Sequence, residues 1–153
     1  MKVKDLMTRN VVSIKPDESL GDVVVKFMEN KISGAPVLDS EELVGVISKA
    51  DILKQLSTAG SMHELLVAVS GLWEKNKKNN NMDYLKKVSE RIVSDVMSRH
   101  VVTVDPESSI ERAARLMVNR NINRLPVVEN KKLLGIVARG DLVKALANIE
   151  LII

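Results

Sequence analysis

The sequence predicts a mixed α/β (α+β) fold in which two similar strand–helix–strand–strand–helix units pack about a pseudo-twofold axis. Three observations lead to this prediction. Residues 3–56 align with residues 93–146 without a gap when the chain is shifted by 90 positions. Each copy combines short β-branched runs with a stripe of helical periodicity. Aromatic residues make up only 2% of the chain, so the core has to be built from aliphatic side chains.

The repeat covers polar and apolar positions alike. The phrase "GVISKADIL" at 45–53 returns as "GIVARGDLV" at 135–143. Similarity at a fixed offset indicates a duplicated structural unit. One such unit has too little core to be stable alone, whereas two packed together bury each other's apolar faces. In first-copy numbers, the identical positions include Asp5, Met7, Arg9, Val11, Val12, Pro16, Ser19, Ile32, Pro36, Val37, Leu43, Gly45, Asp51, Lys54 and Leu56.

Each copy begins with a strand followed by a helix. The runs at 11–14 and 101–104 are rich in valine and are followed closely by Pro16 and Pro106, so we expect two short strands. The helix after each strand has apolar residues three and four positions apart, which place them on one face. The two stripes are Leu20, Val23, Val24, Phe27 and Met28 in the first copy and Ile110, Ala113, Ala114, Met117 and Val118 in the second.

Both helices have predicted N-caps. Ser19 is followed three residues later by Asp22, and Ser108 by Glu111. A hydroxyl at the N-cap and an acidic residue at the third helical position can bond each other's backbone N–H groups. We therefore expect the helices to begin directly after Ser19 and Ser108.

Two further runs in each copy surround a polar turn and predict a β-hairpin. They are "APVLD" with "LVGVIS" in the first copy and "LPVVE" with "LLGIVA" in the second. The repeated phrase ends the hairpin and opens a final helix, "DILKQL" or "DLVKAL".

The chain is expected to contain repeat 1 at 1–58, a helical connector at 59–90 and repeat 2 at 91–153. The connector is predicted to form two short helices, because the asparagine run at 79–81 interrupts its apolar pattern. We interpret the connector as a structural spacer, with a lid or an oligomer contact as the alternative.

Composition and charge exclude several classes of protein. The absence of cysteine excludes disulfides, thiolate catalysis and cysteine metal sites. No apolar stretch follows the N-terminal lysines, and no apolar run approaches the roughly 18 residues of a membrane span. We therefore expect a cytoplasmic protein with no membrane partner. The net charge of +3 would favour anionic partners, although we prefer to explain it by a solvated lysine-rich surface.

The order and spacing of these motifs resemble a tandem pair of CBS domains, the modules named after cystathionine β-synthase, also called a Bateman module. The resemblance rests on "VKDLM…VVSIKPDESL…ISGAPVLD…LVGVISKADIL" and "VSDVM…VVTVDPESSI…INRLPVVE…LLGIVARGDLV". It implies a βαββα fold for each copy and a regulatory module that senses AMP, ADP, ATP or S-adenosylmethionine. It also implies a homodimer formed through the helices and no obligatory cofactor. We expect the signal to pass to a separate effector protein or through a change of oligomeric state.

In this family the last strand is followed by Ser/Thr-x-x-Asp, whose aspartate accepts hydrogen bonds from the ribose hydroxyls. Repeat 1 keeps the pattern as Ser48 and Asp51, while repeat 2 keeps Asp141 but has Ala138 in place of the hydroxyl residue. A carboxylate has two acceptor oxygens and therefore suits a vicinal diol. The alternative is a capping box, in which the aspartate only stabilises the helix start.

The phosphate is expected to meet Arg124. In related nucleotide-sensing pairs, such as the gamma subunit of AMP-activated protein kinase, a basic residue two positions before the proline reaches the phosphates. A guanidinium group matches phosphate geometry, although Arg124 could also be an ordinary surface residue after a helix. The equivalent position in repeat 1 is Gly34, whose missing side chain would let an adenine ring approach the backbone.

Family geometry then predicts two unequal nucleotide clefts. The first cleft, around Asp141, lacks the hydroxyl of the Ser/Thr-x-x-Asp motif. The second cleft, around Asp51, lacks a basic residue for the phosphate. We therefore expect either a single occupied cleft or two clefts of different affinity. The first cleft joins Asp141 and Arg124 to Ser13, Ile14, Ser33 and Gly34. The second joins Ser48 and Asp51 to Thr103, Val104 and Asn123, with Arg124 beside the adenine.

The alternatives to a nucleotide sensor are an enzyme, a nucleic-acid-binding protein and a scaffold without a ligand. An enzyme is not expected, because His63 and His100 have no partner at a known catalytic spacing and no metal motif, phosphate loop or GxGxxG occurs. Nucleic-acid binding would be an adjunct at most, because three scattered aromatic residues cannot form a stacking platform. A CBS pair that dimerises as a scaffold and binds no ligand is the third alternative.

Overall fold

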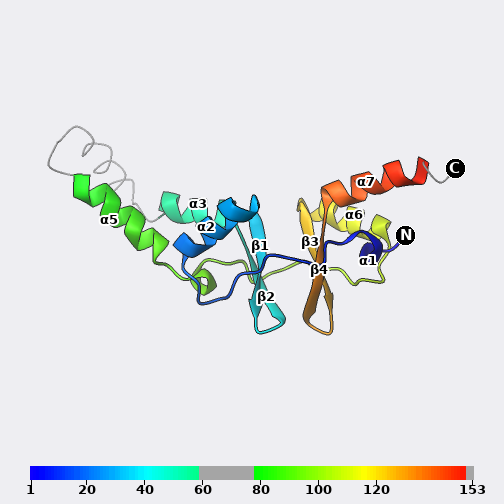
Figure 1. Cartoon of the computed structure of the whole chain (residues 1–153), viewed down its shortest axis with the longest axis horizontal. Helices are drawn as coiled ribbons and strands as arrows, with labels where there is room; N and C mark the ends of the chain where they lie inside the picture. The colour runs from blue at the N-terminus through cyan, green and yellow to red at the C-terminus, as the bar shows by residue number, and fades with distance from the viewer. Residues whose placement is uncertain (59–77, 151–153) are drawn as a thin grey trace. The chain divides into compact units, whose positions relative to one another are not determined.

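A computed structural model describes residues 1–58 and 78–150 (Figure 1). Repeat 1 contains α1 (Val3–Leu6), α2 (Leu20–Asn30), β1 (Gly34–Asp39), β2 (Glu42–Ser48) and α3 (Lys49–Thr58). The connector contributes α5 (Lys78–Ser89). Repeat 2 contains the 3-10 helix η1 (Val93–Asp95), α6 (Ile110–Arg120), β3 (Arg124–Glu129), β4 (Lys132–Ala138) and α7 (Arg139–Glu150). The strand order is β1-β2-β4-β3, so the predicted mixed fold of two similar repeats is confirmed.

The chain forms two compact units that exchange their leading segments, defined here as residues 2–8 of repeat 1 and 92–98 of repeat 2. Residues 2–8 belong to the unit that contains the body of repeat 2, and residues 92–98 belong to the unit that contains the body of repeat 1. Unit 1 consists of Met1–Ser13, Leu38–Val44 and His100–Ile153, and unit 2 of Ile14–Val37 and Gly45–Arg99.

In unit 1 the leading segment is held by backbone hydrogen bonds at both of its ends. The N–H of Val3 donates to the carbonyl of Ser108 at 2.9 Å. Thr8 and Ile136 exchange two bonds, at 2.8 and 2.9 Å, which place the segment against β4. Between these ends α1 contacts α7 and β4 (Figure 1).

Unit 2 repeats this arrangement at positions shifted by 90. The N–H of Val93 donates to the carbonyl of Glu18 at 2.9 Å. Val46 and Ser98 exchange two bonds at 3.0 and 2.9 Å. Each leading segment is therefore an integral part of the opposite repeat's unit.

The glycine that begins the repeated phrase is explained by these crossings. A Cβ atom on Gly135 would lie 2.6 Å from the carbonyl oxygen of Thr8, and one on Gly45 would lie 2.8 Å from that of Ser98. Both distances are shorter than any ordinary contact, and the obstructing atom belongs to a hydrogen-bonded backbone. Glycine at both positions lets the leading segment approach the strand.

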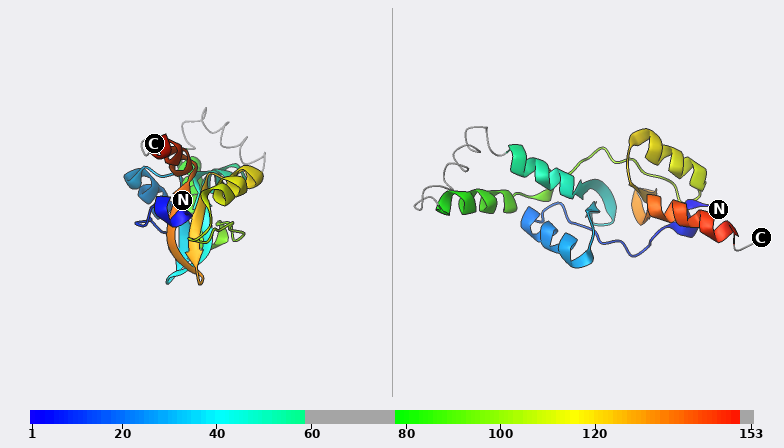
Figure 2. Two further views of the ribbon diagram at one scale, coloured as in Figure 1. Left: turned by 90° about the vertical axis from the view of Figure 1, so that its right-hand side faces the viewer. Right: turned by 90° about the horizontal axis from the view of Figure 1, so that it is seen from above.

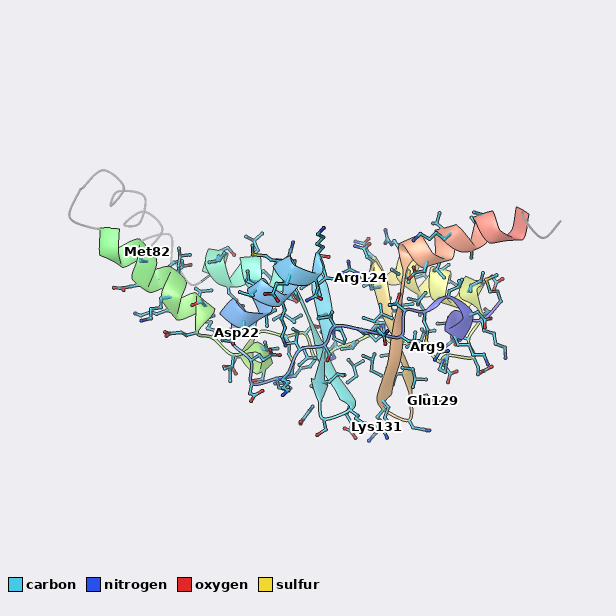
Figure 3. All side chains as sticks on the ribbon, viewed as in Figure 1. Arg9, Asp22, Met82, Arg124, Glu129 and Lys131 are labelled. Atoms are coloured by element: carbon cyan, nitrogen blue, oxygen red, sulfur yellow. The ribbon has the colours of Figure 1, made fainter. Side chains whose placement is uncertain are left out.

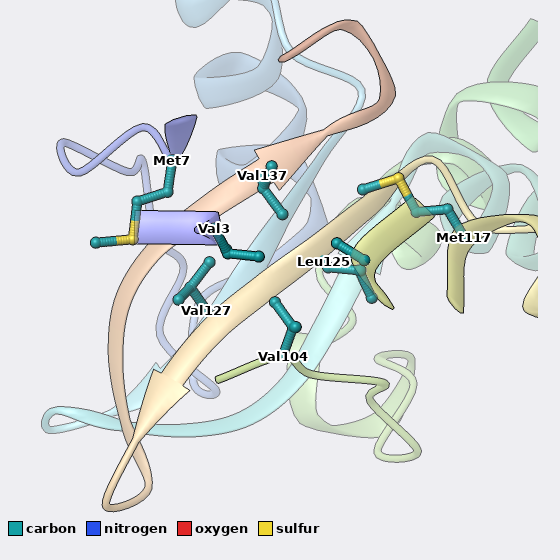
Figure 4. Packing of buried hydrophobic residues seen from close by; sticks show 8 residues of the cluster. Val3, Met7, Val104, Met117, Leu125, Val127 and Val137 are labelled. Atoms are coloured by element: carbon teal, nitrogen blue, oxygen red, sulfur yellow. The ribbon is translucent and has the colours of Figure 1, made fainter. Parts of the chain in front are cut away.

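The core is mainly aliphatic, with the one exception of the buried Phe27 among the described residues, and its positions correspond between the two units. The close-up of the unit 1 core shows these side chains on both leading segment and repeat body (Figure 4). In unit 1 the buried cluster is Val3, Met7, Val104, Ala113, Met117, Leu125, Val127 and Val137. The same positions shifted by 90 are buried in unit 2, namely Val93, Met97, Ile14, Val23, Phe27, Ala35, Val37 and Ile47.

The first strand of each repeat is shorter than predicted. Residues 11–14 and 101–104 contribute single parallel bridges, Ile14 to Val37 and Val104 to Val127. The remaining residues of these runs lie outside the ladder.

The helical stripes are narrower than predicted. Val23 and Phe27 are buried on α2, but Met28 is 71% exposed. On α6, Val118 is 74% exposed while Met117 is buried. Only the residues along one edge of each predicted stripe are therefore buried in the core.

One of the two predicted caps is confirmed and the other is wrong by one residue. Ser19 Oγ accepts a hydrogen bond from the N–H of Asp22 at 3.2 Å. The cap of α6 is Ser109, whose Oγ accepts from the N–H of Arg112 at 3.2 Å. Ser108 stays outside the helix because its carbonyl binds the leading segment.

The connector prediction is wrong at the asparagine run. Residues 79–81 lie inside α5, which contacts α2 and α3 (Figure 2). The hydroxyl of Tyr84 donates to the carbonyl of Leu56, so packing against repeat 1 outweighs the low helix propensity of asparagine. The first predicted connector helix and His63 lie outside the described residues.

Two lysines of the leading segment of unit 1 form ion pairs with Glu107. Hydrogen bonds from Lys2 and Lys4 to Glu107 lower the pKa of this exposed carboxyl from 4.5 to about 2. A carboxyl with a lowered folded-state pKa stabilises the fold above its unfolded pKa. The contribution fades as the pH falls from about 4.5 toward 2.

We expect NMR titration of the Glu107 carboxyl carbon to give a midpoint near pH 2. The double variant Lys2→Ala with Lys4→Ala should return that midpoint to the ordinary range, because both donors are lost. An ordinary midpoint in the unmodified chain would show that the lysines do not hold this carboxylate in solution.

Candidate functional site

Asp51 forms a complete capping box at the start of α3. Its Oδ2 atom accepts hydrogen bonds from the backbone N–H of Ser48 at 2.9 Å and from the Ser48 hydroxyl at 3.0 Å. In return, Ser48 Oγ accepts from the N–H of Asp51 at 3.3 Å. The structure therefore realises the capping arrangement that the sequence allows.

Asp141 caps α7 without help from a hydroxyl. Its Oδ2 atom accepts from the backbone N–H of Ala138 at 2.8 Å. The backbone-to-carboxylate bond is thus common to the two repeats, while the serine contributes only in repeat 1.

In both aspartates, capping uses the carboxylate oxygen Oδ2 and does not use the other oxygen, Oδ1. Among the described residues, Oδ1 of Asp51 and Oδ1 of Asp141 accept no hydrogen bond. The bond to Oδ2 fixes the carboxylate in a partly buried position and so orients Oδ1 in advance. The capping role and the ribose role, which the sequence offers as alternatives, are compatible in this geometry.

Unit 2 brings the repeat 1 residues of the predicted site together. The N–H of Lys49 donates to the carbonyl of Ser33 at 2.9 Å, which ties the start of β1 to the start of α3. Ile14 reaches the same strand through its N–H bond to the carbonyl of Pro36 at 3.0 Å. Gly34, Ser48 and Asp51 therefore lie at one end of the β1–β2 hairpin.

Unit 1 has the equivalent arrangement in repeat 2. The N–H of Arg139 donates to the carbonyl of Asn123 at 3.0 Å, and Arg124 is the Cα partner of Ala138 in the β3–β4 ladder. The N–H of Val104 donates to the carbonyl of Pro126 at 3.0 Å. Thr103, Asn123 and Arg124 are exposed at this end of the hairpin.

Arg124 is available for an anion. It occupies the first position of β3, at the end of the hairpin away from Glu129 and Lys131 (Figure 3). Within the described part of the chain no carboxylate pairs with its guanidinium group. Gly34 occupies the matching position on β1 and is only partly exposed.

Two predicted site residues cannot contribute their side chains. Ile14 is fully buried and Val104 is 4% exposed, and both side chains belong to the cores. Any contact from these residues to a ligand has to come from the backbone. The grouping of site residues into two clefts, including Ser13 and Ser33, stays a prediction.

The sequence did not identify Arg139 as part of this region. Its Nε donates to the carbonyl of Ile122 at 3.1 Å, in addition to the backbone bond to Asn123. Its position between Ala138 and Asp141 in the repeated phrase was the available signal, because Lys49 supplies a cation at the same place in repeat 1.

Two other kinds of site were sought in the described residues. No group of three or more histidine, cysteine, aspartate or glutamate residues there is arranged to hold a metal ion. Among the described helices, none combines the length and apolarity needed to cross a membrane.

Comparison with known proteins identifies the repeats. The CBS domain family matches residues 3–58 and 93–148. Protein MJ1426 of Methanocaldococcus jannaschii is 42% identical over 95% of this chain and 91% of its own length. The chloroplastic CBS domain-containing protein CBSX2 of Arabidopsis thaliana is 34% identical over 97% of this chain and 64% of its own length.

Solved structures agree with this match. The crystal structure of CBSX2 in complex with AMP has a TM-score of 0.74 and 31% identity, and covers 97% of this chain and 98% of that chain. The family match includes both repeats and the relatives cover nearly the whole chain. The chain therefore belongs to the CBS domain family, as a tandem pair of CBS domains.

Proposed function

We propose that the chain is a regulatory module that binds an adenosyl ligand, with AMP as the first candidate, and has no catalytic activity of its own. The observation that carries this proposal is the aspartate after the last strand of each repeat. Each carboxylate is fixed through Oδ2 and keeps Oδ1 for a ligand. The AMP complex of CBSX2 supports the choice of ligand.

The chemistry of the site matches a nucleoside monophosphate. A preoriented carboxylate suits the two ribose hydroxyls. The guanidinium of Arg124, which pairs with no carboxylate in the described part of the chain, suits the phosphate. The first proposed cleft contains Asp141 and Arg124, and the second contains Ser48 and Asp51. Because only the first has an arginine placed for the phosphate and only the second has the motif hydroxyl, we propose two different affinities.

The ligand class is tested by a thermal-shift panel of AMP, ADP, ATP, S-adenosylmethionine and GMP. A ligand at about 100 times its dissociation constant stabilises the folded state by roughly 2.7 kcal/mol. In a chain of this size that corresponds to a rise in Tm of about 5–10 °C. We expect adenosyl ligands to raise Tm and GMP to have no effect. No shift with any of them would favour a scaffold without ligand.

We further propose that the module self-associates through its helices and passes its signal to a separate effector protein. Apolar side chains are exposed on helices of both units, where a second copy could cover them. The most exposed are Val118 at 74%, Met28 at 71%, Met82 at 68%, Val143 at 66%, and Leu53 and Leu146 at 64%. Burial of such side chains would stabilise a dimer by the hydrophobic effect.

A further inference from the structure

Arg139 has two hydrogen bonds to the backbone that leads into Arg124. Its side-chain Nε binds the carbonyl of Ile122 at 3.1 Å, and its backbone N–H binds the carbonyl of Asn123 at 3.0 Å. These two carbonyls belong to the residues that directly precede Arg124. The orientation of the first residue of β3 therefore depends on Arg139.

Helix stability does not account for an arginine at this position. Arg139 is the first residue of α7, where the helix dipole disfavours a positive charge. Its side chain is exposed, and within the described residues it pairs with no carboxylate. The bond to Ile122 is its only side-chain hydrogen bond to another described residue.

The two guanidinium groups come from neighbouring strand ends. Arg124 begins β3, and its Cα partner is Ala138, the last residue of β4 and the neighbour of Arg139. Two cations near this end of the hairpin, neither paired with a carboxylate of the described residues, favour an anionic ligand there. A guanidinium has five N–H donors, so bonding through Nε leaves the two Nη atoms of Arg139 available.

We propose that Arg139 is a positioning residue for the phosphate of the bound nucleotide, acting by fixing the backbone from which Arg124 extends. This inference rests on the proposed function and adds a determinant of phosphate recognition specific to repeat 2. In repeat 1 the same backbone bond is made by Lys49 to Ser33, but Gly34 stands where Arg124 would be.

The test compares AMP with adenosine, which lacks the phosphate, by calorimetric titration. We expect Arg139→Gln to weaken AMP binding about tenfold, the loss typical of one charge-assisted hydrogen bond. Adenosine binding should not change. Arg115→Gln is the control, because it removes the same charge from an exposed position on α6.

A double-mutant cycle separates positioning from independent binding. If Arg139 acts through Arg124, the double variant should bind AMP no more weakly than Arg124→Gln alone. Arg139→Lys keeps the charge but loses the Nε bond, and it should resemble Arg139→Gln. If Arg139→Gln fails to fold, Arg139→Lys is used in its place.

The outcomes distinguish the two proposals. Failure of the unmodified chain to bind AMP or any other adenosyl ligand of the panel would overturn the proposed function itself. If Arg139→Gln and Arg139→Lys both bind AMP normally, with an unchanged ratio of AMP affinity to adenosine affinity, only the proposed role of Arg139 would be overturned. Fully additive losses with Arg124→Gln would also contradict the positioning role.

Discussion

Replacing Gly135 with alanine is expected to destabilise the chain by about 2–3 kcal/mol, an overpacking cost. The added Cβ would lie 2.6 Å from the carbonyl oxygen of Thr8. That oxygen cannot move freely, because Thr8 and Ile136 are joined by two backbone hydrogen bonds. Relief of the clash requires the leading segment to separate from β4.

The effect should appear as a fall in Tm of about 5–10 °C and as faster hydrogen exchange at the Thr8 amide. Gly140→Ala is the matched control, since a Cβ there would have no atom within 4 Å. Because Gly140 lies in α7, that substitution should stabilise the chain by about 0.5–1 kcal/mol. Equal melting temperatures for the two variants would contradict the tight crossing of the leading segment.

Replacing Asp141 with asparagine is expected to remove AMP binding at its site while preserving the fold. Asparagine retains an acceptor oxygen for the N–H of Ala138, so the bond that Asp141 makes back to the start of α7 can be kept. It replaces the second carboxylate oxygen with an amide donor. The loss of two hydrogen bonds to a charged group corresponds to a fall in affinity of at least about 100-fold.

Asp141→Ala separates the capping contribution from the binding contribution. It should lose AMP binding as Asp141→Asn does, and should also lose about 1 kcal/mol of stability through the missing cap. Asp51→Asn, measured in the same titration, reports on the equivalent carboxylate of repeat 1. If Asp141→Asn and Asp51→Asn both bound AMP as the unmodified chain does, these aspartates would be helix caps only.

The internal repeat made the architecture predictable. A shift of 90 residues maps Val3, Val23 and Phe27 onto Val93, Ala113 and Met117, and all six are buried. Duplication preserves burial at these positions, so much of the core could be predicted from the sequence, although the exposed Met28 and Val118 could not. The cap of α6 could also have been predicted, because the same shift maps Ser19 onto Ser109.

The exchange of leading segments could not be predicted in this way. The two segments are alike in sequence, since Val3 and Met7 correspond to Val93 and Met97. Pairing each with its own repeat or with the other would satisfy the same hydrophobic pattern. The contacts of Gly45 with Ser98 and of Gly135 with Thr8 show that each segment pairs with the other repeat. Only these contacts explain why both positions are glycine.

The candidate site was predictable in part. Asp51 and Asp141 were identified from the repeated phrase, but the choice between cap and ligand depends on which oxygens are already bonded. Arg139 was missed because its partners are the backbone carbonyls of Ile122 and Asn123, which only the structure reveals; the sequence shows no more than a cation at the same place in both repeats.

The most direct test of nucleotide sensing is a calorimetric titration of the unmodified chain with AMP, with GMP as the control. We expect AMP to bind with measurable heat, either at one site or at two sites of different affinity, and GMP to give none. Two identical tight sites would contradict the proposed inequality of the repeats. The absence of AMP binding at millimolar ligand would contradict the proposed function.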